Sequence, residues 1–396
     1  MDSPFDLSDL AHAVARPPGD DHGAPLELAP DLAWLRTGIV NVAFLGHPDA
    51  GDRGWVLVDA GLPGFAGAIA RAAEHRFGGA RPAAIVLTHG HFDHVGALKE
   101  LAERWDVLVY AHRLELPYVT GRSSYPPPDP SVGGGLMART SPLFPPGPFD
   151  VGHRARALPD DGDRGDATQE PADSGPVPGA PDWRWHATPG HAPGHVSFFR
   201  ERDRALVAGD AFVTTKQESL AAVYDQRLEI HGPPTYYTPD WDAARGSVER
   251  LAALEPQIAV TGHGLPLAGD ALADGLRTLA RDFDRVARPA HGRYVREPAR
   301  ADETGVTYVP PPVPDATPWA LLGTAALAGL LLATVRTRGG APGATRAEAP
   351  RRRPGARTGY RPLLGDVPGT ARGERHAGER YYDREPWPRY EEPRYS

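Results

Sequence analysis

The segment THGHFDH, residues 88–94, limits more than any other feature of the sequence what this chain can fold into. Three histidines and one aspartate fall within six positions, directly after the apolar run AAIVL, which is typical of a short buried strand. Imidazole and carboxylate groups this close together suit Zn²⁺, Mn²⁺ or Fe²⁺. The chain contains no cysteine, so a metal would be held by histidine and carboxylate alone. We therefore expect a metal site in a loop at the end of a strand.

Strand-like and helix-like segments alternate around this loop. Residues 32–62 contain apolar, β-branched runs that are separated by the turn-forming sequence HPDAGDRG. Helix-like composition follows at 64–79 and at 95–105, and a strand-like run comes after each. Such an alternation predicts an α/β layered domain.

The alternation is interrupted once and then resumes. A Pro/Gly-rich insertion at about 121–182 ends in a stretch too polar to bury a core, and we expect it to be mobile. Further strands follow, then a helix over 241–254 capped by Asp240 and a last helix near 270–286. The predicted catalytic domain therefore spans 31–290.

Four further motifs place chemistry-bearing side chains after apolar runs. LVDAG contains Asp59, TPGHAPGH contains His191 and His195, VAGDAF contains Asp210, and VTGHG contains His263. These side chains could meet only if the strand ends lie along one edge of a sheet, which is where α/β folds place their sites. We expect them to converge on the THGHFDH loop.

These five motifs, in this order, resemble the metallo-β-lactamase superfamily, and most closely its glyoxalase-II-like group. The resemblance implies an αββα sandwich with a centre of two metal ions, zinc in the first place and iron or manganese as alternatives. It implies that Asp210 bridges the ions, and that Asp59 and His195 support the ligands without binding metal. The ligands that it implies for the first ion are His89, His91 and His191, and those for the second are Asp93, His94 and His263.

The function that follows from this resemblance is metal-dependent hydrolysis of a small ester, thioester or lactone. Two cations would lower the pKa of a bound water towards about 7 and polarise the carbonyl or phosphoryl oxygen under attack. Asp93 would orient that water as well as bind metal, which makes it the catalytic residue of the prediction. Tyr236 and Tyr237 lie where family members often place substrate-contacting groups, although packing explains an aromatic pair beside proline equally well.

Other members of the superfamily remain as alternatives. A lactonase of this type usually has a tyrosine soon after the bridging aspartate, whereas AFVTTK follows Asp210 here. A phosphodiesterase or RNA-processing nuclease shares the HxHxDH motif. After residue 335 there are 14 arginines against 8 acidic residues, so the net charge of −8 leaves −14 on residues 1–335. Such an acidic body disfavours a nucleic-acid partner.

The two ends of the chain differ from its middle. Residues 1–30 form a predicted flexible segment without the pattern of a secretory signal peptide, and 291–318 form a Pro-rich linker. Residues 319–335 carry no charge and predict a single transmembrane helix at the lower limit of length, with a helix docked on the globular domain as the alternative. The Arg-rich tail, 336–396, is predicted to be disordered and could meet anionic lipid or a partner. We expect a membrane-anchored enzyme on the cytoplasmic face.

Overall fold

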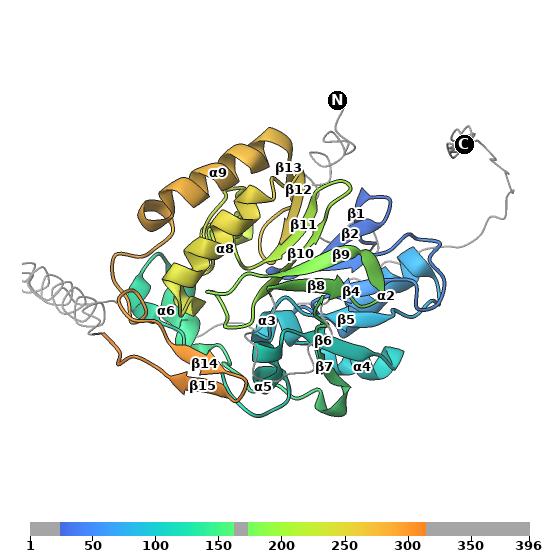
Figure 1. The fold of residues 1–396 in the computed structure, drawn as a ribbon, viewed down its shortest axis with the longest axis horizontal. Coiled ribbons are helices and arrows are strands. Elements are labelled where there is room, and N and C mark those ends of the chain that lie inside the picture. The colour runs from blue at the N-terminus through green and yellow to red at the C-terminus, as the bar shows by residue number, and fades with distance from the viewer. Residues whose placement is uncertain (1–23, 162–172, 314–396) are drawn as a thin grey trace, which may run out of the picture. The chain divides into compact units, whose positions relative to one another are not determined.

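The computed structural model describes residues 24–161 and 173–313, which form two β-sheets packed face to face with helices on their outer sides (Figure 1). In Figure 1, α8 and α9 cover one side of the two sheets, and α4 lies on the other. This arrangement confirms the predicted αββα sandwich.

The first sheet has seven strands whose spatial order follows their order in the chain. Its strands are β1 (Leu26–Ala29), β2 (Leu32–Thr37), β3 (Val40–Leu45), β4 (Val56–Val58), β5 (Ala84–Val86), β6 (Leu108–Ala111) and β7 (Ala155–Ala157). The first four are antiparallel neighbours, and β4 to β7 are parallel. The parallel strands therefore send their carboxyl ends to the same edge of the sheet.

The second sheet has six strands in the order β13-β12-β11-β10-β9-β8. Their bounds are β8 (Ser174–Val177), β9 (Ala180–Ala187), β10 (Val196–Arg200), β11 (Ala205–Gly209), β12 (Ile258–Thr261) and β13 (Leu267–Ala268). Only β11 and β12 are parallel within this sheet; the other neighbours are antiparallel.

Alternating side chains on the central strands separate three layers of core. On β3, Val42 and Phe44 face the helices of the first sheet, whereas Ala43 and Leu45 face the second sheet. On β11, Val207 packs between the sheets and Leu206 packs against the helices beyond. Both faces of these strands are covered, which explains why their sequences are nearly continuous apolar runs.

The outer helices place apolar side chains on one face, at the spacing that a helix requires. On the first sheet, α4 buries Leu98, Leu101, Ala102 and Trp105. On the second sheet, α9 buries Leu272, Leu276, Leu279 and Phe283. The longer helices are α2 (Ala66–Phe77), α4 (Leu98–Trp105), α8 (Trp241–Ala253) and α9 (Gly269–Val286).

As predicted, Asp240 caps α8, with its Oδ1 accepting hydrogen bonds from the N–H groups of Asp242 (3.1 Å) and Ala243 (2.9 Å).

Shorter helical segments connect these elements. The short α-helices are α3 (Phe92–Val95), α5 (Leu116–Val119), α6 (Leu136–Thr140) and α7 (Leu220–Asp225). The 3₁₀ turns are η1 (Arg113–Glu115), η2 (Pro130–Val132), η3 (Ser141–Leu143), η4 (Gly152–Arg154) and η5 (Thr235–Tyr237).

The predicted insertion, 121–182, is built differently from what its composition suggests. Part of it belongs to the sandwich, because β7 pairs with β6 in the first sheet and β8 pairs with β9 in the second. The strand β8 contains Gly175 and Pro176 and still buries Val177 in the core between the sheets. Pairing with a neighbouring strand and burial of a single side chain outweigh local composition here, which is why the expectation of a segment without core structure was wrong for these strands.

The predicted Pro-rich linker, 291–318, also differs from the structure over its first part. Residues 300–308 form a hairpin of β14 (Arg300–Asp302) and β15 (Gly305–Tyr308). The turn is stabilised by Asp302, whose Oδ1 accepts the Thr304 N–H at 2.7 Å. Tyr294 is buried, and its hydroxyl donates to the Pro127 carbonyl at 2.6 Å. This stretch therefore packs onto the domain, and the proline cluster comes only after it.

No helix within 24–161 or 173–313 is long and apolar enough to cross a membrane. Residues 24–30 of the predicted flexible N-terminal segment, 1–30, are described, and the prediction was wrong for them because β1 pairs with β2 in the first sheet. Residues 1–23 lie outside the described residues, as do the predicted transmembrane helix at 319–335 and the predicted tail at 336–396.

Candidate metal centre

The THGHFDH loop follows β5, and a buried aspartate follows the neighbouring parallel strand, β4. Asp59 comes directly after β4, with a backbone φ of 61°, a conformation that aspartate tolerates better than most residues. Its two carboxylate oxygens accept the N–H (2.8 Å) and the hydroxyl (2.7 Å) of Thr88. Its Oδ2 also lies 2.8 Å from Nδ1 of His94. Asp59 thus orients the start of the loop and one of its imidazoles.

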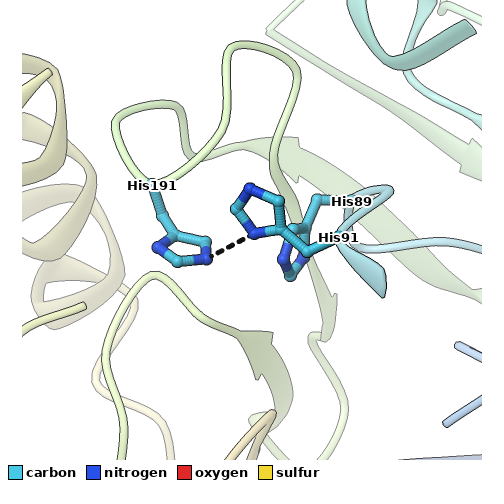
Figure 2. Close-up of side chains that lie close together, drawn as sticks. All are labelled: His89, His91 and His191. Carbon is cyan, nitrogen blue, oxygen red and sulfur yellow. Dashed lines mark hydrogen bonds between the residues drawn. The ribbon is translucent and has the colours of Figure 1, made fainter. Parts of the chain in front are cut away.

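One group of candidate ligands consists of three histidines from the two sheets. His89 and His91 lie in the loop after β5, and His191 lies in the loop between β9 and β10. Figure 2 shows their imidazoles pointing toward one another. Nδ1 of His91 is 2.9 Å from Nε2 of His191, and one nitrogen of each ring lies within 4.8 Å of the others. The three nitrogens are close enough to bind one ion.

Two further groups are linked to the first, because the second shares His89 with it and the third shares His94 with the second. One contains His89, His94 and Asp210, and the other contains Asp93, His94 and His263. Asp210 lies next to the other two groups, because its Oδ2 is 3.4 Å from Nε2 of His191 and 3.1 Å from Nε2 of His263. The structure thus brings all seven sequence-predicted ligands into one cluster.

The glycine before His263 makes room for Asp210. A Cβ atom at Gly262 would lie 2.0 Å from Oδ1 of Asp210 and 2.8 Å from Cε1 of His94. These contacts are far shorter than van der Waals distance, so the VTGHG motif requires glycine at this position. The imidazole of His263 is oriented from its other side, where Nδ1 lies 2.7 Å from the Ile39 carbonyl oxygen.

His195 lies beside the candidate ligands, with its ring 5.1 Å from that of His89, but its nitrogens have other partners. Its Nε2 accepts a hydrogen bond from the Asp210 N–H at 2.9 Å, and its Nδ1 lies 2.9 Å from the Thr188 hydroxyl. Both ring nitrogens are therefore engaged by protein groups. Gly209 permits this contact, since a Cβ there would lie 2.6 Å from Nε2 of His195.

The donor set of the cluster fits a metal ion. Its seven side chains are buried, and Asp93 is the most exposed of them at 8%. Within the described part of the chain, Nε2 of His89, Nε2 of His94 and Oδ1 of Asp210 have no hydrogen-bond partner. Leaving buried polar atoms without partners is costly, and bound metal ions would satisfy them. Nitrogen and oxygen donors of this kind suit zinc and its neighbours in the first transition row.

The protonation preferences of the cluster differ between its two sides. Burial lowers the pKa of His89 and of His91 well below the usual histidine value, and neighbouring histidines lower it further. For His94, burial also acts to lower the pKa, but the carboxylates of Asp210 and Asp59 outweigh it and raise the pKa well above normal. The neutral imidazole, which is the form that binds metal, is thus favoured on the side of His89 and His91.

The carboxylates of the cluster are affected in opposite directions. Burial raises the pKa of Asp93. Burial acts in the same direction on Asp210, but His263 and His94 outweigh it, so the pKa of Asp210 lies well below its usual value. Asp210 is therefore the ionised carboxylate at the middle of the cluster.

Two residues beside this cluster were not found from the sequence. Glu115, after β6, is fully buried and accepts hydrogen bonds from the N–H groups of Gly90 and Gly194. Tyr125, in the predicted insertion, places its ring 4.3 Å from that of His91. A sequence signal exists only for Glu115, as an acidic residue between the apolar residues of HRLELPY, close after a strand.

The two tyrosines that the sequence singled out are buried near the same cluster. The ring of Tyr237 lies 4.7 Å from that of His91, and Tyr236 packs 5.3 Å from Tyr237. The Tyr237 hydroxyl has no hydrogen-bond partner among the described residues. Tyr237 thus combines packing against a candidate ligand with a free polar group.

The chain matches known proteins over the region that contains this cluster. A family model described as the metallo-beta-lactamase superfamily matches residues 35–263. The probable metallo-hydrolase YflN of Bacillus subtilis (strain 168) is 47% identical over 265 residues, covering 67% of this chain and 95% of that protein. The probable metallo-hydrolase YqgX of the same organism is 34% identical over 186 residues, covering 40% of this chain and 72% of that protein.

Solved structures match at lower identity. The crystal structure of the BLEG-1 B3 metallo-beta-lactamase matches with 22% identity and a TM-score of 0.41, covering 61% of this chain and 95% of its own.

The chain belongs to the metallo-β-lactamase superfamily of metal-dependent hydrolases. Proteins of this superfamily bind divalent metal ions, usually zinc, and the His/Asp cluster provides groups that could hold them.

Proposed function

We propose that this protein hydrolyses a small ester, thioester or lactone at a centre of two divalent metal ions, with zinc as the first choice and iron or manganese as alternatives, as in the glyoxalase-II-like group. His89, His91 and His191 would hold one ion, and Asp93, His94 and His263 would hold the other. Asp210 would bridge the two. The observation that carries this proposal is the set of buried candidate ligand atoms without partners among the described residues, namely Nε2 of His89, Nε2 of His94 and Oδ1 of Asp210.

The protein's own groups have distinct tasks in this proposal. When bound, the ions would polarise the carbonyl oxygen of the substrate and lower the pKa of water, which would make water a better nucleophile at neutral pH. Asp93 is the most exposed carboxylate of the cluster, with its Oδ2 3.4 Å from Nε2 of His263. It is therefore the group that can both reach a substrate and orient the attacking water. Asp59 and His195 hold His94 and Asp210 in place.

Aromatic side chains beside the cluster favour an uncharged organic substrate. The rings of Tyr125 and Tyr237 lie next to His91, and Phe144 continues the aromatic surface 6.4 Å from Tyr237. Leu143, next in sequence to Phe144, is 82% exposed. Apolar side chains at this position suit an acyl chain better than a phosphodiester. The net charge of −14 on residues 1–335 is a second argument against a polyanion such as RNA.

A substrate panel tests this proposal. Purified full-length protein, loaded with zinc, iron or manganese, is assayed against thioesters, esters, lactones, phosphodiesters and RNA. We expect turnover of at least one carbonyl substrate, which chelation abolishes and which an Asp210→Ala variant lacks. Turnover of phosphodiesters or RNA alone would replace the substrate class by the nuclease alternative. Activity that survives chelation and the Asp210→Ala substitution would overturn the metal-dependent mechanism.

The membrane anchor at 319–335 is part of the proposal and is supported by the sequence alone. The charge-free run lies between Trp319 on one side and Arg336 and Arg338 on the other, as interfacial anchors would. Full-length protein should sediment with membranes and resist an alkaline wash, with the catalytic domain on the cytoplasmic face. An Ala328→Arg substitution should cost about 2.5–3.5 kcal/mol of insertion and release much of the protein. Full-length protein that stays in the supernatant would contradict the anchor.

A further inference from the structure

We propose that Glu115 is a positioning residue that sets the spacing of His91 and His191, and thereby the metal affinity of the group formed by His89, His91 and His191. The proposal rests on the ligand set proposed above. Glu115 lies in η1, four residues beyond the end of β6, and its side chain is fully buried.

The carboxylate of Glu115 connects two loops that belong to different sheets. Its Oε2 accepts the Gly90 N–H at 2.9 Å, and its Oε1 accepts the Gly194 N–H at 2.8 Å. Gly90 stands between His89 and His91, and Gly194 stands three residues after His191. One side chain therefore holds the backbone of the loop after β5 and that of the loop after β9 at a fixed separation.

Both contacts depend on a close approach that only glycine allows. A Cβ at Gly90 would lie 2.8 Å from the Tyr125 hydroxyl oxygen and 2.9 Å from Cγ1 of Val119. A Cβ at Gly194 would lie 2.9 Å from Cγ of Glu115 and 2.8 Å from Nδ1 of His112. Gly90 of the THGHFDH motif and Gly194 of the TPGHAPGH motif thus let the two loops reach the carboxylate of Glu115.

Tyr125 joins this contact to a ligand side chain. Its hydroxyl donates to Oε2 of Glu115, and its oxygen lies 2.8 Å from the Gly90 nitrogen. Its ring lies 4.3 Å from the His91 ring and stacks on Tyr118 at 3.9 Å. The side of His91 that faces the insertion is thereby fixed by an aromatic ring, which is itself anchored on Glu115.

A buried carboxylate at this position is costly to the fold. Burial raises the pKa of Glu115 to about 7, although its hydrogen bonds to Tyr125, Gly194 and Gly90 act to lower it. A purely structural contact would be cheaper with a neutral side chain. A carboxylate, however, offers an acceptor to both loops at once, whereas an amide has one acceptor oxygen and one donor group.

The test compares Glu115→Gln with the wild type by cobalt binding. Glutamine keeps the size of the side chain but turns an N–H₂ group toward one of the two glycine N–H donors. We expect the affinity for the ion held by the three histidines to fall by about 10–100-fold, as for other groups that orient metal ligands. The visible absorption of the Co²⁺ protein should change in shape and intensity, because it reports ligand geometry. Affinities are measured by competition with a chelator.

The control is the same substitution at Glu218, another buried glutamate. Its Oε1 accepts the Thr235 N–H at 2.7 Å, and among the described residues its carboxylate makes no hydrogen bond to either ligand loop. Glu218→Gln should leave the cobalt spectrum and both affinities unchanged, whatever it does to the melting temperature. If Glu115→Gln lowers the melting temperature and also leaves spectrum and affinity unchanged, Glu115 is only structural and the proposal is overturned.

A milder variant covers the case in which Glu115→Gln does not fold. Tyr125→Phe keeps the carboxylate and both glycine contacts, and removes only the hydroxyl. We expect a smaller loss of affinity and a smaller spectral change, and an unchanged spectrum would contradict the proposal. Cobalt binding to the wild type distinguishes the positioning role of Glu115 from the two-ion centre. If the wild type binds one cobalt ion, the two-ion centre is refuted and Glu115 is still tested on that ion. If it binds none, both proposals are overturned.

Discussion

Two buried carboxylates flank the metal-ligand loop, and they hold it in different ways. Asp59 acts within this one loop: it accepts the N–H and the hydroxyl of Thr88, and its Oδ2 lies 2.8 Å from Nδ1 of the candidate ligand His94. The hydrogen bonds of Glu115 go to backbone N–H groups at Gly90 and Gly194, and to Tyr125. Asp59 thus influences the charge and orientation of one imidazole, whereas Glu115 fixes the distance between two loops.

The topology of the first sheet explains why the loop has one carboxylate on each side. The strands β4, β5 and β6 are parallel neighbours, so the segments after them lie next to one another. Asp59 follows β4, the THGHFDH loop follows β5, and Glu115 follows β6. The difference teaches that carboxylates after neighbouring strands can support the same loop in two ways. Asp59 orients an imidazole of the loop, whereas Glu115 ties the backbone of the loop to that of a second loop. These two mechanisms should have separable effects on the two ions of the proposed centre.

The largest effect on metal content is expected for substitution of Asp210. This residue takes part in neither mechanism, because its carboxylate lies between the groups of candidate ligands. Asp210→Ala removes the carboxylate beside His191, His94 and His263. We expect the metal content to fall from about two ions per chain to one or fewer, and activity to be lost. Elemental analysis of freshly purified protein measures this, with Asp182→Ala at the exposed surface as the control. A wild type with one ion or fewer in metal-replete preparations would refute the two-ion centre.

The next largest effect should come from Asp59→Asn. Asparagine has one acceptor oxygen, so it cannot serve both the Thr88 groups and His94 as the carboxylate does. We expect the ion that His94 binds to lose about 10–100-fold in affinity, and the ion held by His89, His91 and His191 to change little. Glu115→Gln should give the opposite pattern in the same chelator competition. If both variants weaken the same ion equally, the comparison between the two carboxylates is wrong.

Most of the fold could be predicted from the sequence, because its strands are covered on both faces. Covered strands appear as apolar runs such as AAIVL before Thr88 and ALVAG before Asp210, and the polar ligands begin where those runs end. Asp59 was found in the same way, directly after β4. A ligand at a strand end has a local signal that needs no knowledge of tertiary contacts.

The rest of the site depends on contacts between distant segments. Tyr125 reaches His91 from an insertion whose composition indicates a mobile loop, and Glu115 has partners 25 and 79 residues away. The hairpin at 300–308 likewise has a distant partner, since the Val306 N–H donates to the Ser123 hydroxyl across 183 residues. Proline and glycine content describes local backbone preference, and it does not report which distant surface a segment will cover.

A smaller effect, on stability, is expected on the Glu115 side of the loop. His112 is buried next to Gly194. Burial, and to a smaller extent the positive charge of Arg113, lower the pKa of His112 from 6.5 to about 4. Below pH 6.5 the unfolded chain takes up a proton that the folded chain does not bind. The contribution of His112 to stability is therefore complete above that pH and is lost as the pH falls towards 4.

Substitution of His112 by Asn should remove this dependence. Asparagine retains an acceptor for the Leu114 N–H, which Nδ1 of His112 now accepts at 3.3 Å. Between pH 7 and pH 5 the wild type should lose about 1–2 kcal/mol more of its free energy of unfolding than the variant. Urea unfolding of both proteins in chelator, at each pH, measures the difference. Equal losses in the two proteins would show that His112 is protonated equally easily in the folded and unfolded chains.

The smallest effect is expected for His195, although it is as buried as the ligands. Its Nε2 is occupied by the Asp210 N–H, whereas Nε2 of His89 has no partner among the described residues. His195→Gln can keep an acceptor near the Asp210 nitrogen, so we expect both ions to stay bound with affinities within about 10-fold of the wild type. His89→Gln, the matched control, should lose an ion, because it replaces a nitrogen ligand. Elemental analysis of the two variants decides between the roles: if His195→Gln loses an ion as His89→Gln does, His195 is itself a ligand, and Asp210 is held in place by other contacts.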